Sequence, residues 1–154
     1  DLVTKPFERE DLLRVLWRNL VRRRGGRILV ADDDPVIRES LGSFLGRLGL
    51  ETVMAEDGKE ALDAIRTDAP DAVILDLAMP GMDGMTFLGK LRENPLHVGL
   101  PVLVLTGMEV TRRQHEELGD LASAVVHKGV GMQDELEDIL GSYFRLAEGE
   151  PAAG

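Results

Sequence analysis

Four short apolar runs, each closed by polar or charged residues, constrain the fold of this chain more than any other feature. They end at Asp32 and Asp33, at Asp76, at Thr106 and at Lys128. Continuous apolar runs bounded by turn residues are typical of strands that are buried on both faces of a sheet. In an open parallel α/β sheet, functional groups gather just outside the carboxyl ends of such strands. The sequence therefore predicts that three carboxylates, a hydroxyl and an ammonium group converge in one pocket.

Helical periodicity between these runs predicts a chain that alternates strand and helix. The expected strands are 27–32, 50–55, 72–76, 101–106 and 124–127. The expected helices are 35–48, 58–67, a helix that follows the turn 79–84 and ends near 93, 112–118, and 132–146. Such alternation demands parallel pairing with right-handed crossovers, hence a doubly wound three-layer α/β domain. We expect this domain over 27–147 and a disordered tail over 148–154.

Residues 1–26 differ from the rest and predict an extra N-terminal helix followed by a linker. Apolar residues lie there at helical spacing: Leu13, Leu16, Trp17 and Leu20. The basic run Arg22-Arg23-Arg24 and the pair Gly25-Gly26 then predict a flexible joint at the end of this helix. The apolar stripe must be buried on the adjacent domain or on a second copy of the chain, and the second arrangement is a homodimer through this helix.

Charge and composition exclude several classes of function. Residues 1–27 carry eight Lys/Arg and four Asp/Glu, so the remainder of a chain with net charge −10 carries −14. A body this acidic argues against binding of nucleic acid. The absence of Cys excludes thiolate metal sites and suits a reducing compartment, so we expect a cytoplasmic protein. No apolar run approaches the roughly 20 residues that span a membrane.

The clustered carboxylates require a counter-charge, because like charges at close range raise one another's pKa. Oxygen ligands with no Cys or His nearby indicate Mg²⁺ or Mn²⁺ rather than zinc. A Mg²⁺ site of few carboxylates suits phosphoryl chemistry, in which Lys128 and the Thr106 hydroxyl would contact phosphoryl oxygens. A carboxylate in line with an incoming phosphoryl group is itself a nucleophile and gives an acyl phosphate.

Four segments, in order and with appropriate gaps, carry a resemblance to a known family: ILVADDDPVIRESL, DAVILDLAMPGMDG, PVLVLTG and VVHKG. Through them, residues 27–146 resemble the receiver domain of two-component response regulators. The resemblance implies a flavodoxin-like fold with a five-stranded parallel sheet in the order 2-1-3-4-5. It also implies a regulatory module that catalyses its own phosphorylation but is not an enzyme acting on an external metabolite.

The resemblance also implies roles for the pocket residues, with Asp76 as the phosphoacceptor. Asp33 would be the direct metal ligand and Asp32 would support it. The implied ligand set of the Mg²⁺ is Asp32, Asp33, Asp76 and the backbone carbonyl of Ala78. Thr106 and Lys128 would contact the phosphoryl group, and the donor would be a histidine kinase or a histidine phosphotransfer domain. Asp34 has no catalytic role in this interpretation and is expected to cap a helix.

Two positions depart from the family pattern. Val125 stands where a receiver commonly has Tyr or Phe, and Gly129 stands where a proline in a cis bond commonly follows the lysine. VVHKGV resembles receivers of hybrid histidine kinases more than those of transcription factors. The segment DLVTKPFEREDLLRVLWRNL resembles the last strand, Lys-Pro turn and final helix of another receiver, so residues 1–26 are interpreted as the end of an upstream receiver.

Two other classes of function share part of this pattern. Phosphatases of the haloacid-dehalogenase type also use an aspartyl nucleophile but place a second Asp two residues later, where this chain has Ala78. A receiver-shaped interaction domain with weak or no phosphorylation is the other alternative. The complete acidic set argues against it, and the missing aromatic at Val125 keeps it open. The P-loop-like segment 84–90 is followed by Leu91 instead of Ser/Thr and falls within an expected helix, so it is a chance match.

Overall fold

The structure is a computed structural model that describes residues 26–107 and 110–146 of the 154-residue chain. The N-terminal helix expected over 1–26 lies outside the described residues except for Gly26, and the tail expected over 148–154 lies outside them entirely. Among the described residues, no helix is long and apolar enough to cross a membrane.

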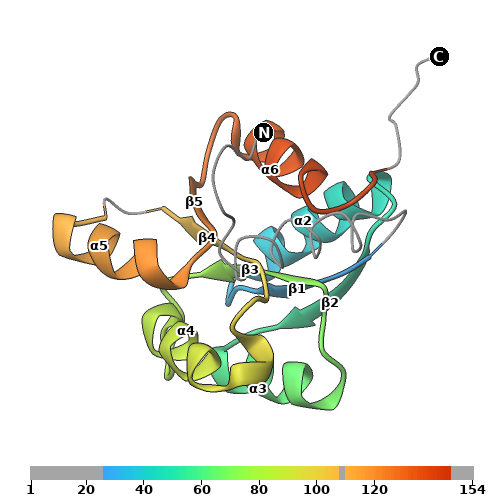
Figure 1. Cartoon of the computed structure of the whole chain (residues 1–154). Coiled ribbons are helices and arrows are strands. Elements are labelled where there is room, and N and C mark those ends of the chain that lie inside the picture. Colours follow the sequence, from blue (N-terminus) through green and yellow to red (C-terminus); the bar gives the residue numbers. More distant parts are fainter. Residues whose placement is uncertain (1–25, 108–109, 147–154) are drawn as a thin grey trace, which may run out of the picture.

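Five parallel strands form one sheet in the order β2-β1-β3-β4-β5, which confirms the predicted fold class (Figure 1). The strands are β1 Arg27–Ala31, β2 Glu51–Ala55, β3 Ala72–Asp76, β4 Val102–Thr106 and β5 Ala124–His127. The helices are α2 Pro35–Arg47, α3 Gly58–Thr67, α4 Gly84–Glu93, α5 Arg112–Leu121 and α6 Met132–Gly141, with a short 3₁₀ helix, η1, at Pro95–His97.

The central strands β1, β3 and β4 have continuous apolar runs, broken only by polar residues at their ends, because both faces of the sheet are covered. In β1, Ile28 and Val30 belong to the core beneath α2 and α6, whereas Leu29 belongs to the core on the side of α3, α4 and α5. All five residues of β3 and all five of β4 are buried. Side chains of a strand alternate between its faces, so only a strand buried on both sides has no polar alternation.

The last helix is shorter than the sequence predicts, because it ends at Gly141 instead of continuing to 146. Ser142 Oγ donates to the carbonyl of Ile139 at 2.6 Å, and the backbone N–H of Ser142 donates to the same carbonyl. These two hydrogen bonds close a tight turn that ends the helix. Phe144 nevertheless lies in the core, as predicted, with 2% of its surface exposed. A Cβ atom on Gly26 would lie 2.9 Å from the Phe144 ring, so the chain enters β1 directly against this side chain.

Candidate functional site

The parallel register brings the carboxyl ends of four strands to one edge of the sheet. Ala31 of β1 pairs with Leu75 of β3, so the residues that follow them, Asp32 and Asp76, stand side by side. Thr106 ends β4 and pairs with His127, the last residue of β5. The structure therefore gathers the polar residues that the sequence places in one pocket.

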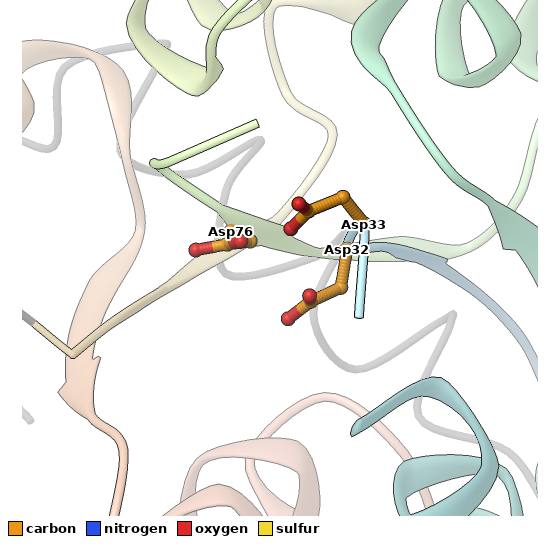
Figure 2. Close-up of side chains that lie close together, drawn as sticks. All are labelled: Asp32, Asp33 and Asp76. Carbon is orange, nitrogen blue, oxygen red and sulfur yellow. The ribbon is translucent and has the colours of Figure 1, made fainter. Parts of the chain in front are cut away.

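Three carboxylates cluster at the ends of β1 and β3 (Figure 2). One oxygen each of Asp32, Asp33 and Asp76 lies within 4.8 Å of the others. Asp32 and Asp76 are buried, with 1% and 4% of their surface exposed, whereas Asp33 is exposed at the rim. Two of the three negative charges are thus removed from water, which is unfavourable without positive charge nearby.

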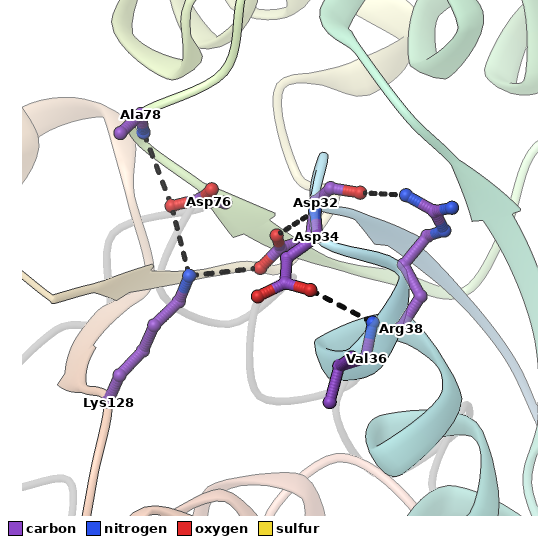
Figure 3. Close-up of polar contacts among 7 residues, drawn as sticks. All are labelled: Asp32, Asp34, Val36, Arg38, Asp76, Ala78 and Lys128. Carbon is purple, nitrogen blue, oxygen red and sulfur yellow. Dashed lines mark hydrogen bonds and ion pairs between the residues drawn. The ribbon is translucent and has the colours of Figure 1, made fainter.

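Lys128 supplies part of that positive charge from the residue after β5 (Figure 3). Its Nζ lies 3.1 Å from Oδ2 of Asp32 and 3.5 Å from Oδ1 of Asp76. Burial alone would lower the pKa of Lys128, but the hydrogen bond and charge of Asp32, joined by those of Asp76, outweigh burial and raise it. The ammonium group is therefore charged at neutral pH.

The pKa of Asp76 is raised above its ordinary value. Burial is the largest cause, and the charge of Asp32 acts in the same direction. A hydrogen bond from the N–H of Ala78 to Oδ1 of Asp76, at 3.2 Å, lowers the pKa, as do the charge and hydrogen bond of Lys128. Lys128 and the Ala78 N–H therefore offset burial and the charge of Asp32 only in part.

The donor set fits a hard divalent cation. Asp32 Oδ2 is buried, and within the described residues its contact is the ammonium group of Lys128, with Nζ 3.1 Å away. A buried carboxylate next to two further carboxylates, with one ammonium group to offset their charge, suits a ligand set for Mg²⁺ or Mn²⁺. The N–H of Ala78 donates a hydrogen bond to Asp76, so Ala78 lies beside the carboxylate cluster. That the carbonyl of Ala78 is a metal ligand stays a prediction.

Local sequence explains how the loop after β1 is held. The side chain of Asp34 accepts a hydrogen bond from the N–H of Val36 at 2.9 Å and caps α2, which confirms the predicted capping role. Pro35 occupies the first turn of that helix, where a missing N–H is harmless. The N–H of Asp34 in turn donates to Oδ1 of Asp32 at 2.9 Å. The helix start and the buried acid are thus tied together.

A glycine is required where α4 begins, beside the strand that carries Asp76. A Cβ atom on Gly84 would lie 2.7 Å from the carbonyl oxygen of Asp76 and 2.7 Å from the Cα of Leu77. The N–H of Gly84 donates to the carbonyl of Leu77 at 3.0 Å. Only a residue without a side chain permits this close approach.

The end of β5 has two unusual features where the sequence departs from the family pattern. Gly129 has φ +130°, a conformation that L side chains rarely adopt, and the described residues contain no cis peptide bond. Val125 is half-buried and packs against the core on the side of α3, α4 and α5. The peptide after Lys128 is thus held differently from the cis-proline arrangement that the resemblance implies.

Sequence reasoning missed Arg38. Its Nη1 donates to the backbone carbonyl of Asp32 at 2.7 Å (Figure 3). A basic residue one turn after a helix cap is common on exposed helix surfaces, so its position alone gives no signal of a contact with this loop.

Comparison with known proteins identifies relatives of this fold and site. A family model for the response regulator receiver domain matches residues 28–140. The response regulator MprA of Mycolicibacterium vanbaalenii is 48% identical over 83 residues, which cover 54% of this chain and 35% of that protein. Protein-glutamate methylesterase/protein-glutamine glutaminase 1 of Anaeromyxobacter dehalogenans is 46% identical over 83 residues, which cover 53% of this chain and 23% of that protein. The chain therefore spans about a third or less of these relatives.

Two solved structures are similar over most of the chain. The N-terminal domain of a response regulator receiver protein from Methanoculleus marisnigri has a TM-score of 0.64 and 32% identity, and the match covers 74% of this chain and 93% of that one. The Vibrio cholerae chemotaxis protein CheY4 has a TM-score of 0.67 and 28% identity, with 74% and 95% covered.

Proposed function

The chain belongs to the family of response regulator receiver domains of two-component systems, and from that premise we propose that Asp76 accepts a phosphoryl group from a phosphohistidine in a Mg²⁺-dependent reaction. The observation that carries the proposal is the buried Asp76 carboxylate, which lies beside two further carboxylates and 3.5 Å from the ammonium group of Lys128. This geometry supports a site at which a nucleophile, a bound cation and a positive charge would act together.

The proposed reaction is a phosphoryl transfer between two side chains. A carboxylate oxygen of Asp76 forms a bond to phosphorus while the bond from phosphorus to the donor imidazole nitrogen breaks. The imidazole keeps the electron pair of that bond and takes up a proton. When bound, the divalent cation offsets the negative charge of the phosphoryl oxygens.

The residues of the chain would orient the group and mark its presence. Lys128, which now pairs with Asp32 and Asp76, would donate to a phosphoryl oxygen. Thr106 is buried at the end of β4, where its hydroxyl would reach another phosphoryl oxygen. Asp33 and Asp32, with the carbonyl of Ala78, would hold the cation together with Asp76.

The proposed partner is a histidine kinase or a histidine phosphotransfer domain, and the domain itself is regulatory. Because the chain spans about a third or less of its curated relatives, further domains of the parent protein would carry the output. We place this receiver in a hybrid histidine kinase or multi-receiver protein, with residues 1–26 as the end of an upstream receiver.

A homodimer through that segment is tested by size-exclusion chromatography: a chain truncated to begin at Arg27 should elute as a monomer if the full chain is a dimer.

Binding of beryllofluoride, a mimic of the phosphoryl group, tests the proposal. Addition of Mg²⁺ and beryllofluoride should shift the amide resonances of residues around Asp76, Thr106 and Lys128. The same addition to Asp76→Asn should leave those resonances at their positions with Mg²⁺ alone. If the folded wild-type chain gives no response, the proposal is refuted and the alternative of an interaction domain without phosphorylation is supported.

A further inference from the structure

Arg38 contacts the loop that carries the proposed metal ligands, although it is not one of them. It lies in the second turn of α2 and is half-buried. Its Nη1 donates to the carbonyl of Asp32 at 2.7 Å, a short distance that is typical of a charged donor. Figure 3 shows this carbonyl directed toward Arg38, while the carboxylate of Asp32 is directed toward Lys128.

Asp33 has no restraint of its own. Within the described residues, no hydrogen bond or ion pair holds its carboxylate, and the residue is exposed. Its oxygen nevertheless belongs to the cluster with Asp32 and Asp76. The direction of the Asp33 side chain therefore depends on its backbone, which is set by the peptide planes before and after it.

One hydrogen bond holds each of these two planes. The plane before Asp33 contains the Asp32 carbonyl, which accepts from Arg38. The plane after it contains the N–H of Asp34, which donates to Oδ1 of Asp32 at 2.9 Å. On the far side of Asp32, its own N–H donates to the carbonyl of Ala55 at 3.1 Å, which anchors the end of β1 to β2. Within residues 26–107 and 110–146, Arg38 is thus the one residue whose side chain hydrogen-bonds the Asp32–Asp33 peptide.

We propose that Arg38 is a positioning residue of the metal site: by holding the Asp32 carbonyl toward α2, it directs the Asp33 carboxylate toward Asp76. This inference rests on the proposed function, because it assigns Arg38 to the Mg²⁺ site of that function. Groups that orient metal ligands from outside the ligand set commonly change metal affinity by about tenfold or more when they are removed.

A purely electrostatic role for Arg38 gives the opposite expectation. A guanidinium group near a cation site repels the cation, so removing its charge would tighten Mg²⁺ binding. If Arg38 positions Asp33, removing it loosens the ligand and weakens binding despite the lost repulsion. The sign of the change therefore separates the two roles.

The experiment measures the Mg²⁺ dissociation constant of the full 154-residue chain by calorimetry. Arg38→Met keeps the alkyl stem and removes the donor, and we expect it to weaken binding by about tenfold. Arg38→Lys keeps the charge and can donate from a shorter reach, so we expect an intermediate affinity. Arg47→Met is the matched control, since Arg47 lies exposed in the last turn of the same helix and loses the same charge; its affinity should stay within about twofold of the wild type.

A second readout reports the backbone contact without the metal. The ¹⁵N shift of the Asp33 amide responds to the hydrogen bond that the preceding carbonyl accepts, and it should move in Arg38→Met but not in Arg47→Met. Affinity in Arg38→Met equal to or tighter than that of Arg47→Met, or an unmoved Asp33 amide, would overturn the inference. If Arg38→Met does not fold, the same comparison with Arg38→Lys decides. A wild-type chain that binds no Mg²⁺ would instead refute the proposed function.

Discussion

Lys128 Nζ lies 3.1 Å from Asp32 Oδ2, closer than it lies to the proposed phosphoacceptor. In this state the buried supporting acid is therefore the main partner of the lysine. A phosphoryl group on Asp76 would compete with the Asp32 carboxylate for the ammonium group of Lys128, because it carries more negative charge than a carboxylate does. Phosphorylation of Asp76 would therefore replace the ion pair between Lys128 and Asp32 with a contact between Lys128 and the phosphoryl group.

Removal of the lysine charge should raise the pKa of Asp76 further. Lys128 lowers that pKa through its charge and hydrogen bond, so Lys128→Met leaves burial and the charge of Asp32 opposed by the Ala78 hydrogen bond alone. A ¹³C-detected titration of the Asp76 carboxyl in metal-free protein measures this shift. Lys90→Met, at an exposed lysine of α4, is the control and should leave the titration unchanged. An Asp76 titration that stays the same or moves downward in Lys128→Met would contradict the account.

The raised pKa of Asp76 fixes the sign of its effect on stability. The folded chain holds a proton on this group at pH values where the unfolded chain has lost it. The contribution of Asp76 to stability therefore falls as pH rises from the ordinary value of 3.8 through the folded value. The pKa of Lys128 is also raised, so its contribution is complete below 10.5 and is lost as pH rises through its folded value.

Asp76→Asn should therefore stabilise the metal-free protein at pH 7, by about 1 kcal/mol, because it removes a buried charge from a cluster of like charges. Denaturant unfolding in the presence of a chelator measures the difference. Asp83→Asn is the control, since Asp83 caps α4 at an exposed position and Asn caps equally well. Saturating Mg²⁺ should reverse the order, because the wild type binds the ion more tightly than Asp76→Asn does. If Asp76→Asn were less stable than the wild type in the presence of a chelator, the carboxylates of the cluster would not destabilise the metal-free fold by their mutual repulsion.

A methyl group at Gly84 should disturb the loop that carries Asp76. The added Cβ would meet two backbone atoms at 2.7 Å, and backbone cannot move aside as a flexible side chain can. We expect Gly84→Ala to destabilise the fold by about 2 kcal/mol or more. Gly89→Ala is the matched change in the same helix, where a Cβ meets nothing within 4 Å, and it should stabilise by about 0.5–1 kcal/mol. Equal effects in the two variants would mean that the close approach at Gly84 does not exist.

An aromatic side chain at Val125 should leave phosphoryl acceptance largely intact. Val125 is half-buried on the side of α3, α4 and α5 and lies outside the carboxylate cluster. The initial rate of phosphorylation of Val125→Tyr from acetyl phosphate should stay within about threefold of the wild type, while thermal unfolding reports any loss of packing. A variant that folds but accepts no phosphoryl group would place Val125 in the phosphorylation machinery.

Much of the fold could be predicted from the sequence, because the apolar runs of the strands and the helical spacing between them indicate the same alternation of strand and helix. The buried run that ends at Asp76 and the helix 58–67 have the bounds predicted for them. The end of the last helix could not be predicted, since the apolar spacing continues past Gly141 to Phe144 while the backbone turns at Ser142. Periodicity reports which side chains are buried, and it does not report how the backbone brings them there.

The site could be predicted only in part for a similar reason. Strand ends identify Asp32, Asp76 and Thr106 because a parallel sheet aligns those ends. Arg38 and the close approach at Gly84 depend on how a helix packs against a loop, which strand and helix patterns do not specify. The preference of Lys128 for Asp32 is likewise a matter of distances within the folded pocket.

The intact mass of the full chain after incubation with acetyl phosphate and Mg²⁺ tests whether Asp76 is the phosphoacceptor. We expect a gain of one phosphoryl group in the wild type, no gain in the presence of a chelator, and no gain in Asp76→Asn. Asp83→Asn should gain the group as the wild type does. A folded wild-type chain that gains no mass, or an Asp76→Asn variant that gains the same mass as the wild type, would contradict the claim that Asp76 is the phosphoacceptor.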